Sequence, residues 1–422
     1  MENDNRHIFV KGGKRLQGEV TIEGSKNSAL VCMAASALAD KDTTVTLNNV
    51  PDISDVYVMI DLLRALGKTV TYENEVFKIT GELKYTELPR ELCGSIRGST
   101  YFLGVMMAGL NHAYLGLPGG DRIGARPIDI HLDNLEMMGM KYKMDGGVVE
   151  GTAPNGLSGR DLFLSFPSVG ATCNIIMAAS RAKGKTTISN CAKEPEIVDL
   201  ANLLSQMGVK IIGAGSDKIT IYGSAPIKTD VEHDVISDRI ETGVFITAVA
   251  ITGGDAVIKN CTPYHNYPLI SMLSKAGVFI EANDNEIHVV STGDVNALKI
   301  TTMPFPGVAT DLQPLLTVLA LKADGISTIT DLVFPERFSY IYELAKMGAK
   351  LEHSGNTVRI TGVKRIDGTK VVGSDIRAAT ALVCAGLMAD GVTEVEGMHH
   401  IERGYKDFVG KLKSLGAEIM IK

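Results

Sequence analysis

The sequence predicts an α/β protein made of six copies of one βαβαββ unit, three in each of two domains. Three observations predict this class, and the first two are a helix-stop pattern that recurs at an almost constant interval and a block of small apolar residues before each stop. The third is size. A chain of 422 residues, 45% of them apolar, exceeds one ordinary core and favours two domains.

The helix-stop pattern is apolar-x-x-apolar-Gly-x-x-apolar, as in "LLRALGKTV" and "KLKSLGAEI". Its glycines follow one another at intervals of 72, 69, 69, 71 and 68 residues. In each copy we expect an amphipathic helix to end at the glycine and an extended segment to follow. The six glycines are Gly67, Gly139, Gly208, Gly277, Gly348 and Gly416.

The remaining elements of the unit follow in a fixed order. A strand leads into a helix of small apolar residues, such as "SALVCMAASALA" or "RAATALVCAGLMA". A short strand such as "STITDLVF" comes next, then the Gly-stopped helix, then a hairpin such as "KLEHSGNTVRITG". Because the helices are rich in Ala, Met and Leu, we expect them to be largely buried.

The two ends of the chain predict how the units are divided. The sixth copy stops at "AEIMIK", one strand short, and "HIFVKG" near the start supplies a matching strand. We therefore expect one discontinuous domain, residues 1–25 and 236–422, with residues 26–235 inserted as the other. The chain would cross near residues 24–26 and 236–238. A continuous six-unit solenoid is the alternative, but the polar terminal caps that solenoids need are lacking.

Composition and charge exclude several classes of function. The net charge of −7 disfavours a general nucleic-acid surface. The N-terminus lacks an apolar segment, and no apolar run is long enough to span a membrane. We expect a cytoplasmic protein with no metal site and no cofactor, and a monomer. The cysteines are far apart in sequence, as in reduced, buried thiols: Cys32, Cys93, Cys173, Cys191, Cys261 and Cys384.

Charged residues gather where the small-residue helices begin. Helix capping accounts for Asp311, Asp375 and Ser168 taken singly. Capping does not account for the cations, since a cation in the first turn opposes the helix dipole by a few tenths to ~1 kcal/mol. A shared anionic ligand at the helix starts would offset that cost. The cations concerned are Lys26, Arg97, Arg239 and Arg377.

The segment "LPGGDRIGARPIDIHL", residues 117–132, combines glycines with charged residues and lacks an apolar face. Its glycines allow the backbone to bend close to a ligand. Arg126 offers the planar fork that suits phosphate or carboxylate. Asp121 suits proton transfer on a loop that closes over substrate. The alternative is a surface ion pair between Asp121 and Arg122.

The motifs that carry these residues resemble those of the UDP-N-acetylglucosamine 1-carboxyvinyltransferase family of enolpyruvyl transferases. Eight motifs occur in order: "GSKNSAL", "LPGGDRIGARPIDIHL", "SVGAT", "EPEIVD", "DRIETG", "TDLQ", "SDIRAA" and "HIERGY". The resemblance implies two inside-out α/β barrel domains, with the inserted domain carrying the catalytic loop and the site in the cleft between them. It also implies transfer of the enolpyruvyl group of phosphoenolpyruvate to the 3′-hydroxyl of UDP-N-acetylglucosamine by addition and elimination, releasing phosphate for peptidoglycan precursor synthesis.

The resemblance assigns the cations to the small anionic substrate. By motif position, Lys26, Arg126 and Arg403 would hold the phosphate and carboxylate of phosphoenolpyruvate. Arg337 and Arg377 would support the carboxylate and close the cleft.

The acids receive roles in proton transfer. Asp311 would accept the sugar hydroxyl proton, Asp375 would assist the elimination, and Asp121 would protonate the methylene carbon. Arg97 would reach the cleft or the diphosphate. The positions implied to bind the UDP-sugar are Asn27, Pro127, Ile128, Asp129, Ile130, His131, Ser168, Val169, Gly170 and Val333.

Two positions depart from the family pattern. Most members have cysteine where this chain has Asp121, which predicts insensitivity to fosfomycin because its epoxide alkylates that thiolate. To act as an acid, Asp121 must also hold a proton that nearby arginines oppose, so ligand binding has to favour the protonated form. Phe166 stands where some members carry a lysine near the uridine.

Two other functions are compatible with the sequence. The acceptor could be shikimate 3-phosphate or another nucleotide, although "RPIDIHL" and "EPEIVD" favour the UDP-sugar. A non-catalytic paralogue that binds UDP-sugar is the alternative from another class, and it would be expected to lack the acid–base groups that are present here.

Overall fold

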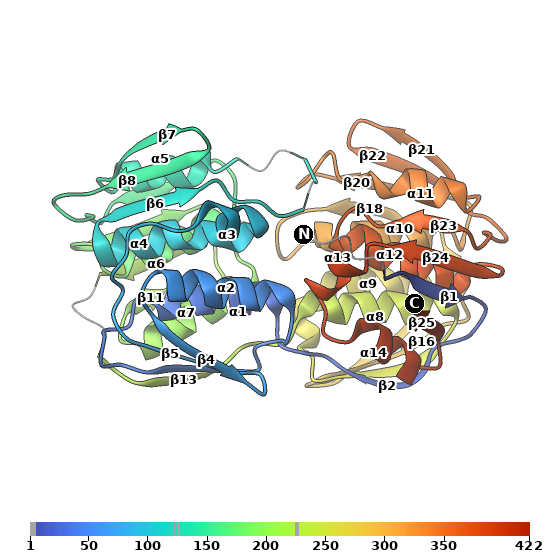
Figure 1. Cartoon of the computed structure of the whole chain (residues 1–422). Helices are drawn as coiled ribbons and strands as arrows, with labels where there is room; N and C mark the ends of the chain where they lie inside the picture. The colour runs from blue at the N-terminus through green and yellow to red at the C-terminus, as the bar shows by residue number, and fades with distance from the viewer. Residues whose placement is uncertain (1–5, 122, 125–126, 224–227) are drawn as a thin grey trace. The chain divides into compact units, whose positions relative to one another are not determined.

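The computed structural model describes residues 6–121, 123–124, 127–223 and 228–422. Two compact units are formed, and each is continuous in space but not in sequence (Figure 1). Unit 1 comprises Met1–Glu23, Asp121–Ala125 and Ser237–Lys422, and unit 2 comprises Gly24–Gly120 and Arg126–Ile236. The short segment Asp121–Ala125 thus groups with unit 1, whereas the sequence analysis assigned the whole loop 117–132 to the inserted domain.

Unit 2 contains three copies of the predicted repeat. The first copy forms a sheet of order β13-β3-β5-β4, in which β13 and β3 are parallel and the other neighbours antiparallel. Its first strand, β13, comes from the end of the inserted segment. The elements are β13 (Val231–Asp234), α1 (Lys26–Ser36), β3 (Val45–Asn48), α2 (Ser54–Ala65), β4 (Thr69–Glu73) and β5 (Val76–Thr80).

The second and third copies repeat this order. In the second copy an isolated parallel bridge from Glu87 to Tyr114 stands in place of the first strand. Its elements are α3 (Arg90–Ser95), η1 (Arg97–Thr100), α4 (Tyr101–Leu110), β6 (His112–Gly116), α5 (Asp129–Met137), β7 (Lys141–Asp145) and β8 (Val148–Thr152). The third copy has β9 (Asp161–Phe163), α6 (Val169–Ala179), β10 (Lys185–Ser189), α7 (Pro195–Gln206), β11 (Lys210–Ile212) and β12 (Lys218–Tyr222).

Unit 1 contains the other three copies. The fourth has β2 (Gln17–Thr21), α8 (Arg239–Thr252), β14 (Asp255–Lys259), η2 (Pro263–Asn266), α9 (Tyr267–Lys275), β15 (Phe279–Ala282) and β16 (Glu286–Val290). The fifth has β18 (Lys299–Thr302), η3 (Thr310–Leu312), α10 (Gln313–Ala320), β20 (Ile326–Asp331), α11 (Tyr340–Lys346), β21 (Lys350–Ser354) and β22 (Thr357–Thr361). Between them, β17 (Val295–Asn296) pairs with β19 (Ala323–Asp324).

The sixth copy is completed by the start of the chain. Its elements are β23 (Lys370–Val372), α12 (Ile376–Met388), β24 (Val392–Glu396), α13 (Met398–Glu402), α14 (Phe408–Ser414), β25 (Glu418–Ile421) and β1 (Ile8–Lys11). Strand β1 lies between β24 and β25 and is antiparallel to both, with Ile8 opposite Val395 and Ile421. The prediction that "HIFVKG" supplies the missing strand is confirmed.

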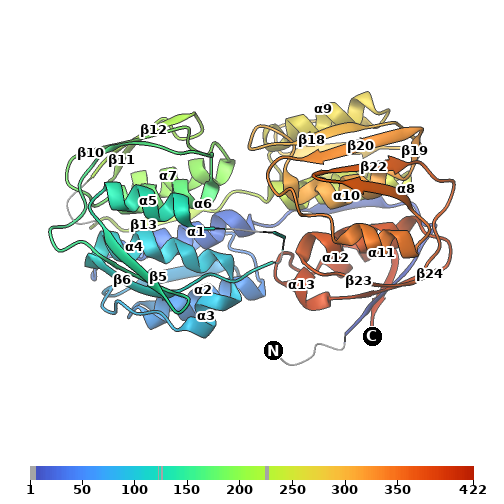
Figure 2. The same ribbon diagram turned by 90° about the horizontal axis from the view of Figure 1, so that it is seen from above.

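The helices form the interior of each unit. In α1, α4, α6, α8, α10 and α12 most residues are buried, and the sheets lie outside them (Figure 2). The six stop glycines have φ values from 91° to 110°, a region that favours glycine. This arrangement is the predicted mixed α/β fold with buried helices and outer sheets, and it confirms the fold class.

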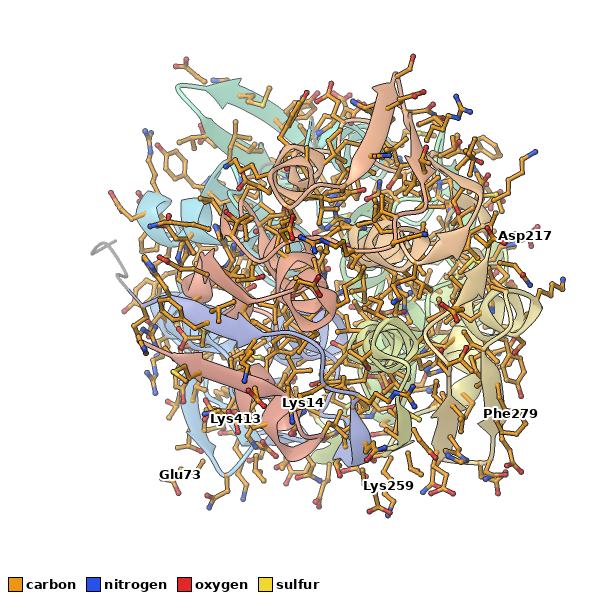
Figure 3. All side chains as sticks on the ribbon, turned by 90° about the vertical axis from the view of Figure 1, so that its right-hand side faces the viewer. Lys14, Glu73, Asp217, Lys259, Phe279 and Lys413 are labelled. Carbon is orange, nitrogen blue, oxygen red and sulfur yellow. The ribbon has the colours of Figure 1, made fainter. Side chains whose placement is uncertain are left out.

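The outer faces of the sheets carry charge. Lys259 and Phe279 point outward at the edge of unit 1 (Figure 3), and Lys259 pairs with Glu19 at 2.6 Å. Over the described part of the chain, none of the helices combines the length and the apolar character needed to cross a membrane.

Candidate active site

Asp311 lies between two arginines of unit 1. Its Oδ1 accepts a hydrogen bond from Arg337 at 2.7 Å, and its Oδ2 from Arg377 at 3.2 Å. Both arginine side chains are buried. Burial alone would raise the pKa of Asp311, but the charges of Arg377 and Arg337 hold it well below its usual range. The carboxylate is therefore ionised, and it does not cap η3, whose N-cap is Ala309.

Arg377 is the second residue of α12, and Asp375 is its N-cap. The Asp375 carboxylate accepts hydrogen bonds from the backbone N–H groups of Arg377 at 2.9 Å and Ala378 at 3.1 Å. Arg377 also donates to the Tyr405 hydroxyl, and its guanidinium lies 5.4 Å from the centre of that ring. The capping interpretation thus holds for Asp375, and the cap places the Arg377 side chain beside Asp311.

Asp331 is a further acid of this cluster that the sequence analysis missed. This fully buried residue ends β20 and accepts from Thr310 Oγ1 at 2.7 Å and from the backbone N–H groups of Val333 and Phe334 at 2.9 and 2.8 Å. Asp331 therefore fixes both η3, which carries Asp311, and the turn that contains Val333. The only signal in the sequence is a carboxylate at the end of an apolar strand.

Asp121 pairs with Arg403 within unit 1. Asp121 Oδ1 accepts a hydrogen bond from Arg403 at 2.8 Å, and both side chains are largely buried. Arg403 follows α13 directly. Arg122 and Arg126 lie outside the described residues, so the surface pair of Asp121 with Arg122 and the predicted role of Arg126 stay predictions.

Lys26 begins α1 in unit 2 and is nearly buried. Its Nζ lies 3.4 Å from Oδ2 of Asp55, a buried acid in the first turn of α2 that the sequence analysis did not single out. Ser25 caps the helix by accepting from the Ser28 N–H. Asn27, the next residue, is half-buried. The cation is thus held at a helix start, where free N–H groups also favour an anion.

His131, Arg97 and the start of α6 lie together in unit 2. The Asn174 amide donates to His131 Nδ1 at 2.8 Å, so the ring carries its proton on Nε2. Burial, and next the charge of Arg97, lowers the pKa of His131 to about 3, which keeps the imidazole neutral. Arg97 donates to the Pro127 carbonyl at 3.2 Å. A Cβ on Gly170 would lie 3.0 Å from the imidazole, so a larger residue there would press on the ring.

Several other residues expected to contact a nucleotide sugar lie at the starts of α5 and α6 or just before them, whereas Val333 lies in unit 1. Ser168 caps α6 by accepting from the Ala171 N–H at 3.3 Å, and Phe166, just before it, is exposed. At the start of α5, Ile128 is buried and Asp129 exposed. Half-buried positions in this group are Ile130, Val169 and Gly170.

Two groups of side chains have spacings suited to a metal ion. Cys32, Asp199 and His233 are buried, with ligand atoms within 4.8 Å of one another, but these atoms bond each other: His233 Nε2 lies 2.8 Å from Asp199 Oδ1, and the Cys32 thiol donates to Oδ2. The other group is His7, Glu394 and Glu396, and Lys370 pairs with its two acids. In both groups the candidate ligand atoms already have hydrogen-bond or ion-pair partners among the described residues.

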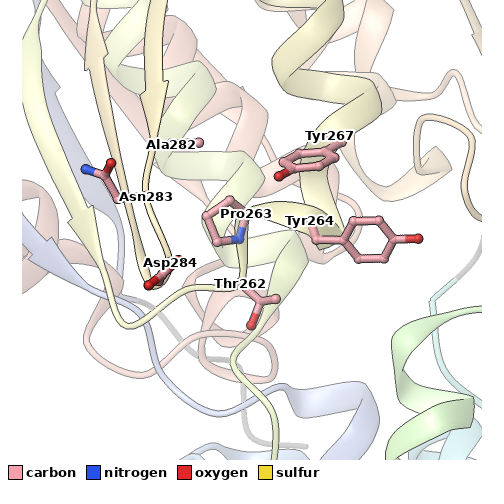
Figure 4. A pocket seen from close by; sticks show the side chains of 7 residues that line it. All are labelled: Thr262, Pro263, Tyr264, Tyr267, Ala282, Asn283 and Asp284. Atoms are coloured by element: carbon pink, nitrogen blue, oxygen red, sulfur yellow. The ribbon is translucent and has the colours of Figure 1, made fainter.

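Two pockets lie away from these residues. One, of about 420 Å³ in unit 1, is lined by Tyr264, Tyr267 and the turn at Asn283 and Asp284 (Figure 4). The other, of about 500 Å³ in unit 2, is lined by both acids and bases, including Asp40 and Arg181. Neither of these two pockets is lined by a residue predicted for the site.

Comparisons with known proteins agree with the motifs. The family model of EPSP synthase (3-phosphoshikimate 1-carboxyvinyltransferase) matches residues 10–412. UDP-N-acetylglucosamine 1-carboxyvinyltransferase 2 of Carboxydothermus hydrogenoformans is 45% identical over 98% of both chains. UDP-N-acetylglucosamine 1-carboxyvinyltransferase 1 of Halalkalibacterium halodurans is 44% identical over 98% of this chain and 93% of its own.

Solved structures agree as well. The enolpyruvyl transferase NikO from Streptomyces tendae superposes with a TM-score of 0.88 at 27% identity, covering 99% of each chain. EPSP synthase from Acinetobacter baumannii shares the fold, with a TM-score of 0.77 at 19% identity over 99% of this chain and 100% of its own. The chain belongs to the EPSP synthase family and, within it, to the UDP-N-acetylglucosamine 1-carboxyvinyltransferases.

Proposed function

We propose that the protein transfers the enolpyruvyl group of phosphoenolpyruvate to the 3′-hydroxyl of UDP-N-acetylglucosamine and releases phosphate, which begins peptidoglycan precursor synthesis in the cytoplasm. The observation that carries the proposal is Asp311 held between Arg337 and Arg377, in a chain 45% identical over 98% of its length to a relative of that name. One ionised acid beside two buried cations suits deprotonation of a hydroxyl next to a bound carboxylate.

Asp311 is the proposed base. As the structure stands, Arg337 and Arg377 hold its pKa well below the usual range, which makes it a weak base. When the substrate carboxylate binds the same arginines, it competes with Asp311 for their hydrogen bonds. The proton affinity of Asp311 then rises as the substrate arrives, so that the base becomes effective in the substrate complex.

Asp121 is the proposed acid for the methylene carbon, and Asp375 is proposed to assist the elimination. The ion pair with Arg403 opposes protonation of the Asp121 carboxylate. The hypothesis therefore requires that an anionic substrate bind Arg403 in place of Asp121. Lys26 and Arg126 complete the proposed anion site.

The UDP-sugar is proposed to contact the group around His131 in unit 2. A neutral imidazole, the Arg97 guanidinium and the capped start of α6 offer hydrogen bonds and a positive end for a diphosphate. We further propose that the enzyme acts as a monomer without metal or cofactor.

The decisive experiment is phosphate release from phosphoenolpyruvate with each acceptor in turn. Release with UDP-N-acetylglucosamine, together with a product heavier by one enolpyruvyl group, is the expected result. Turnover with shikimate 3-phosphate instead would show that shikimate 3-phosphate is the acceptor. Binding of UDP-sugar without turnover would favour a non-catalytic paralogue.

A further inference from the structure

Apart from the short segment Asp121–Ala125, the chain passes between unit 1 and unit 2 at Glu23–Gly24 and at Ile236–Ser237. The segments at these crossovers run side by side. The Asp238 N–H donates to the Glu23 carbonyl at 2.9 Å, and the Ser25 N–H donates to the Ile236 carbonyl at 2.7 Å. Each segment leads directly into a helix that begins with charged residues, α1 with Lys26 and α8 with Arg239.

A buried carboxylate of unit 1 accepts a hydrogen bond from the backbone of the first crossover. Glu241, in the first turn of α8, accepts from the Glu23 N–H at 2.9 Å through one oxygen and from Lys411 Nζ at 2.8 Å through the other. Lys411, on α14, also lies 3.1 Å from the Glu23 carboxylate. The exposed fraction of the Glu241 side chain is 3%. In Figure 1, α14 lies beneath α8.

A buried carboxylate of unit 2 likewise accepts a hydrogen bond from the backbone of the second crossover. Asp199 of α7 accepts from the Ile236 N–H at 3.4 Å and from His233 Nε2 at 2.8 Å. It also accepts from the hydroxyl of Ser28, in the first turn of α1. Asp199 thus joins the strand that leads to α8 to the helix that carries Lys26.

We propose that Glu241 and Asp199 are positioning residues for enolpyruvyl transfer, which hold the two crossovers so that α1 and α8 present their first-turn charges to the substrates. This inference rests on the proposed function. Arg239 and Asp238 lie close enough to the Asp311–Arg377 pair to affect the pKa values of both, so a shift of the α8 start alters the field at the proposed base. A shift of the α1 start displaces Lys26.

A purely structural explanation is less satisfactory. A neutral side chain could accept from a single backbone N–H, whereas burying a carboxylate is costly even when it is paired. Misplacement of reacting groups by about 1 Å costs about a hundredfold in rate, so accurate placement has a kinetic value that stability lacks.

The charge on Glu241 can be tested by comparing kcat of the wild type and a neutral variant at each pH. Groups that titrate in both proteins affect both kcat values alike, so the ratio reports Glu241. Burial raises the pKa of Glu241 to about 7 against the opposing effect of Lys411. The charged groups that face it are Lys411 on α14, Glu23 before the crossover and Asp238 at the cap of α8, while Arg377 on α12 and Asp311 on η3 interact with the Asp238–Arg239 end. Glu241→Gln fixes the neutral state without changing the shape of the side chain.

The test compares kcat for phosphate release in the wild type and in Glu241→Gln from pH 6 to pH 9. We expect kcat of the variant to be about tenfold to a hundredfold lower at pH 8.5 and to approach the wild-type value at pH 6, where wild-type Glu241 is itself protonated. Glu343→Gln is the matched control, because Glu343 also pairs with a lysine, Lys346, and accepts from a backbone N–H, that of Val372. It should retain wild-type kcat throughout.

Equal kcat at pH 8.5, or a ratio that stays constant with pH, overturns the inference for Glu241. If Glu241→Gln does not fold, Lys411→Gln tests the same charge pair from the other side, and a wild-type pH profile there overturns it equally. Asp199→Asn should lower kcat by a comparable factor, and wild-type kcat in that variant overturns the assignment of Asp199.

Hydrogen exchange separates this inference from the proposed function. In Glu241→Met, which has no acceptor oxygen, the Glu23 amide should exchange at least tenfold faster than in the wild type, while Glu343→Met leaves it unchanged. An unchanged exchange rate of the Glu23 amide refutes the proposal that Glu241 holds the crossover, whatever reaction the protein catalyses. Absence of phosphate release in the wild type with every acceptor refutes the proposed function instead.

Discussion

Asp311 is the proposed base, and its two arginine partners hold its pKa well below the usual range. Because Arg337 and Arg377 bind it, the neutral variant Asp311→Asn should lose the base and free both arginines. We expect kcat to fall by about 10²- to 10⁴-fold while the affinity for phosphoenolpyruvate is unchanged or higher. Steady-state kinetics and calorimetric titration of phosphoenolpyruvate check this. Loss of phosphoenolpyruvate binding would show that the arginines need Asp311 to hold their positions.

We predict that Asp121 makes the protein insensitive to fosfomycin. A carboxylate is a much weaker nucleophile towards an epoxide than a cysteine thiolate, so the wild type should keep its activity during long incubation with fosfomycin. Asp121→Cys should become inactivated over time, and Asp121→Glu, which has no thiol, should stay resistant. Residual activity against incubation time measures this, and rapid inactivation of the wild type would falsify the prediction.

Glu241 should make stability depend on pH in a defined window. Between its ordinary pKa of 4.5 and about 7, the native state keeps a proton that the unfolded chain has released, so the free energy of unfolding falls as pH rises. Above pH 7 the group is ionised in both states and adds no further slope. Urea unfolding at a series of pH values measures the free energy of unfolding of the wild type and of Glu241→Gln. The difference between the two should fall as pH rises through this window, and a difference that does not change with pH contradicts the prediction.

At the scale of elements, variants of Asp375 at the N-cap of α12 distinguish a capping role from a role in proton transfer. Asp375→Ala removes the acceptor for the Arg377 and Ala378 N–H groups and should lower the free energy of unfolding by about 0.5–2 kcal/mol. Asp375→Asn keeps a capping oxygen, so its stability should stay near that of the wild type. Thermal unfolding measures both. If Asp375→Asn still loses kcat, its charge serves the reaction; full activity would restrict Asp375 to the cap.

The elements also show how far local pattern predicts structure. The glycine stops, the buried small-residue helices and the hairpins follow from steric limits and periodicity within short windows, and all are present. Ser168 and Asp375 cap their helices as their residue types suggest, whereas Asp311 binds two arginines instead. The difference lies in what the fold places opposite each acid.

At the scale of the whole molecule, the start of the chain completes the last sheet. Strand β1 bonds both β24 and β25, so deleting residues 1–11 leaves the two strands without their common neighbour and uncovers the core beneath Ile8 and Val10. We expect such a variant to be insoluble or to unfold well below the wild-type temperature. A variant that begins at residue 6 keeps β1 and should melt like the wild type. Similar melting of both deletions would contradict the prediction.

The sequence by itself determined the sixfold repeat, the strand shared between the two ends and the residues that carry the family motifs, because spacing, glycine geometry and apolar periodicity act over short stretches of chain. Only the tertiary structure decided which charges meet. The pairing of Asp311 with Arg377, of Lys26 with Asp55 and of Glu241 with Lys411 joins residues 66, 29 and 170 positions apart. Such pairs depend on how helices pack, and no local pattern in the chain encodes that packing.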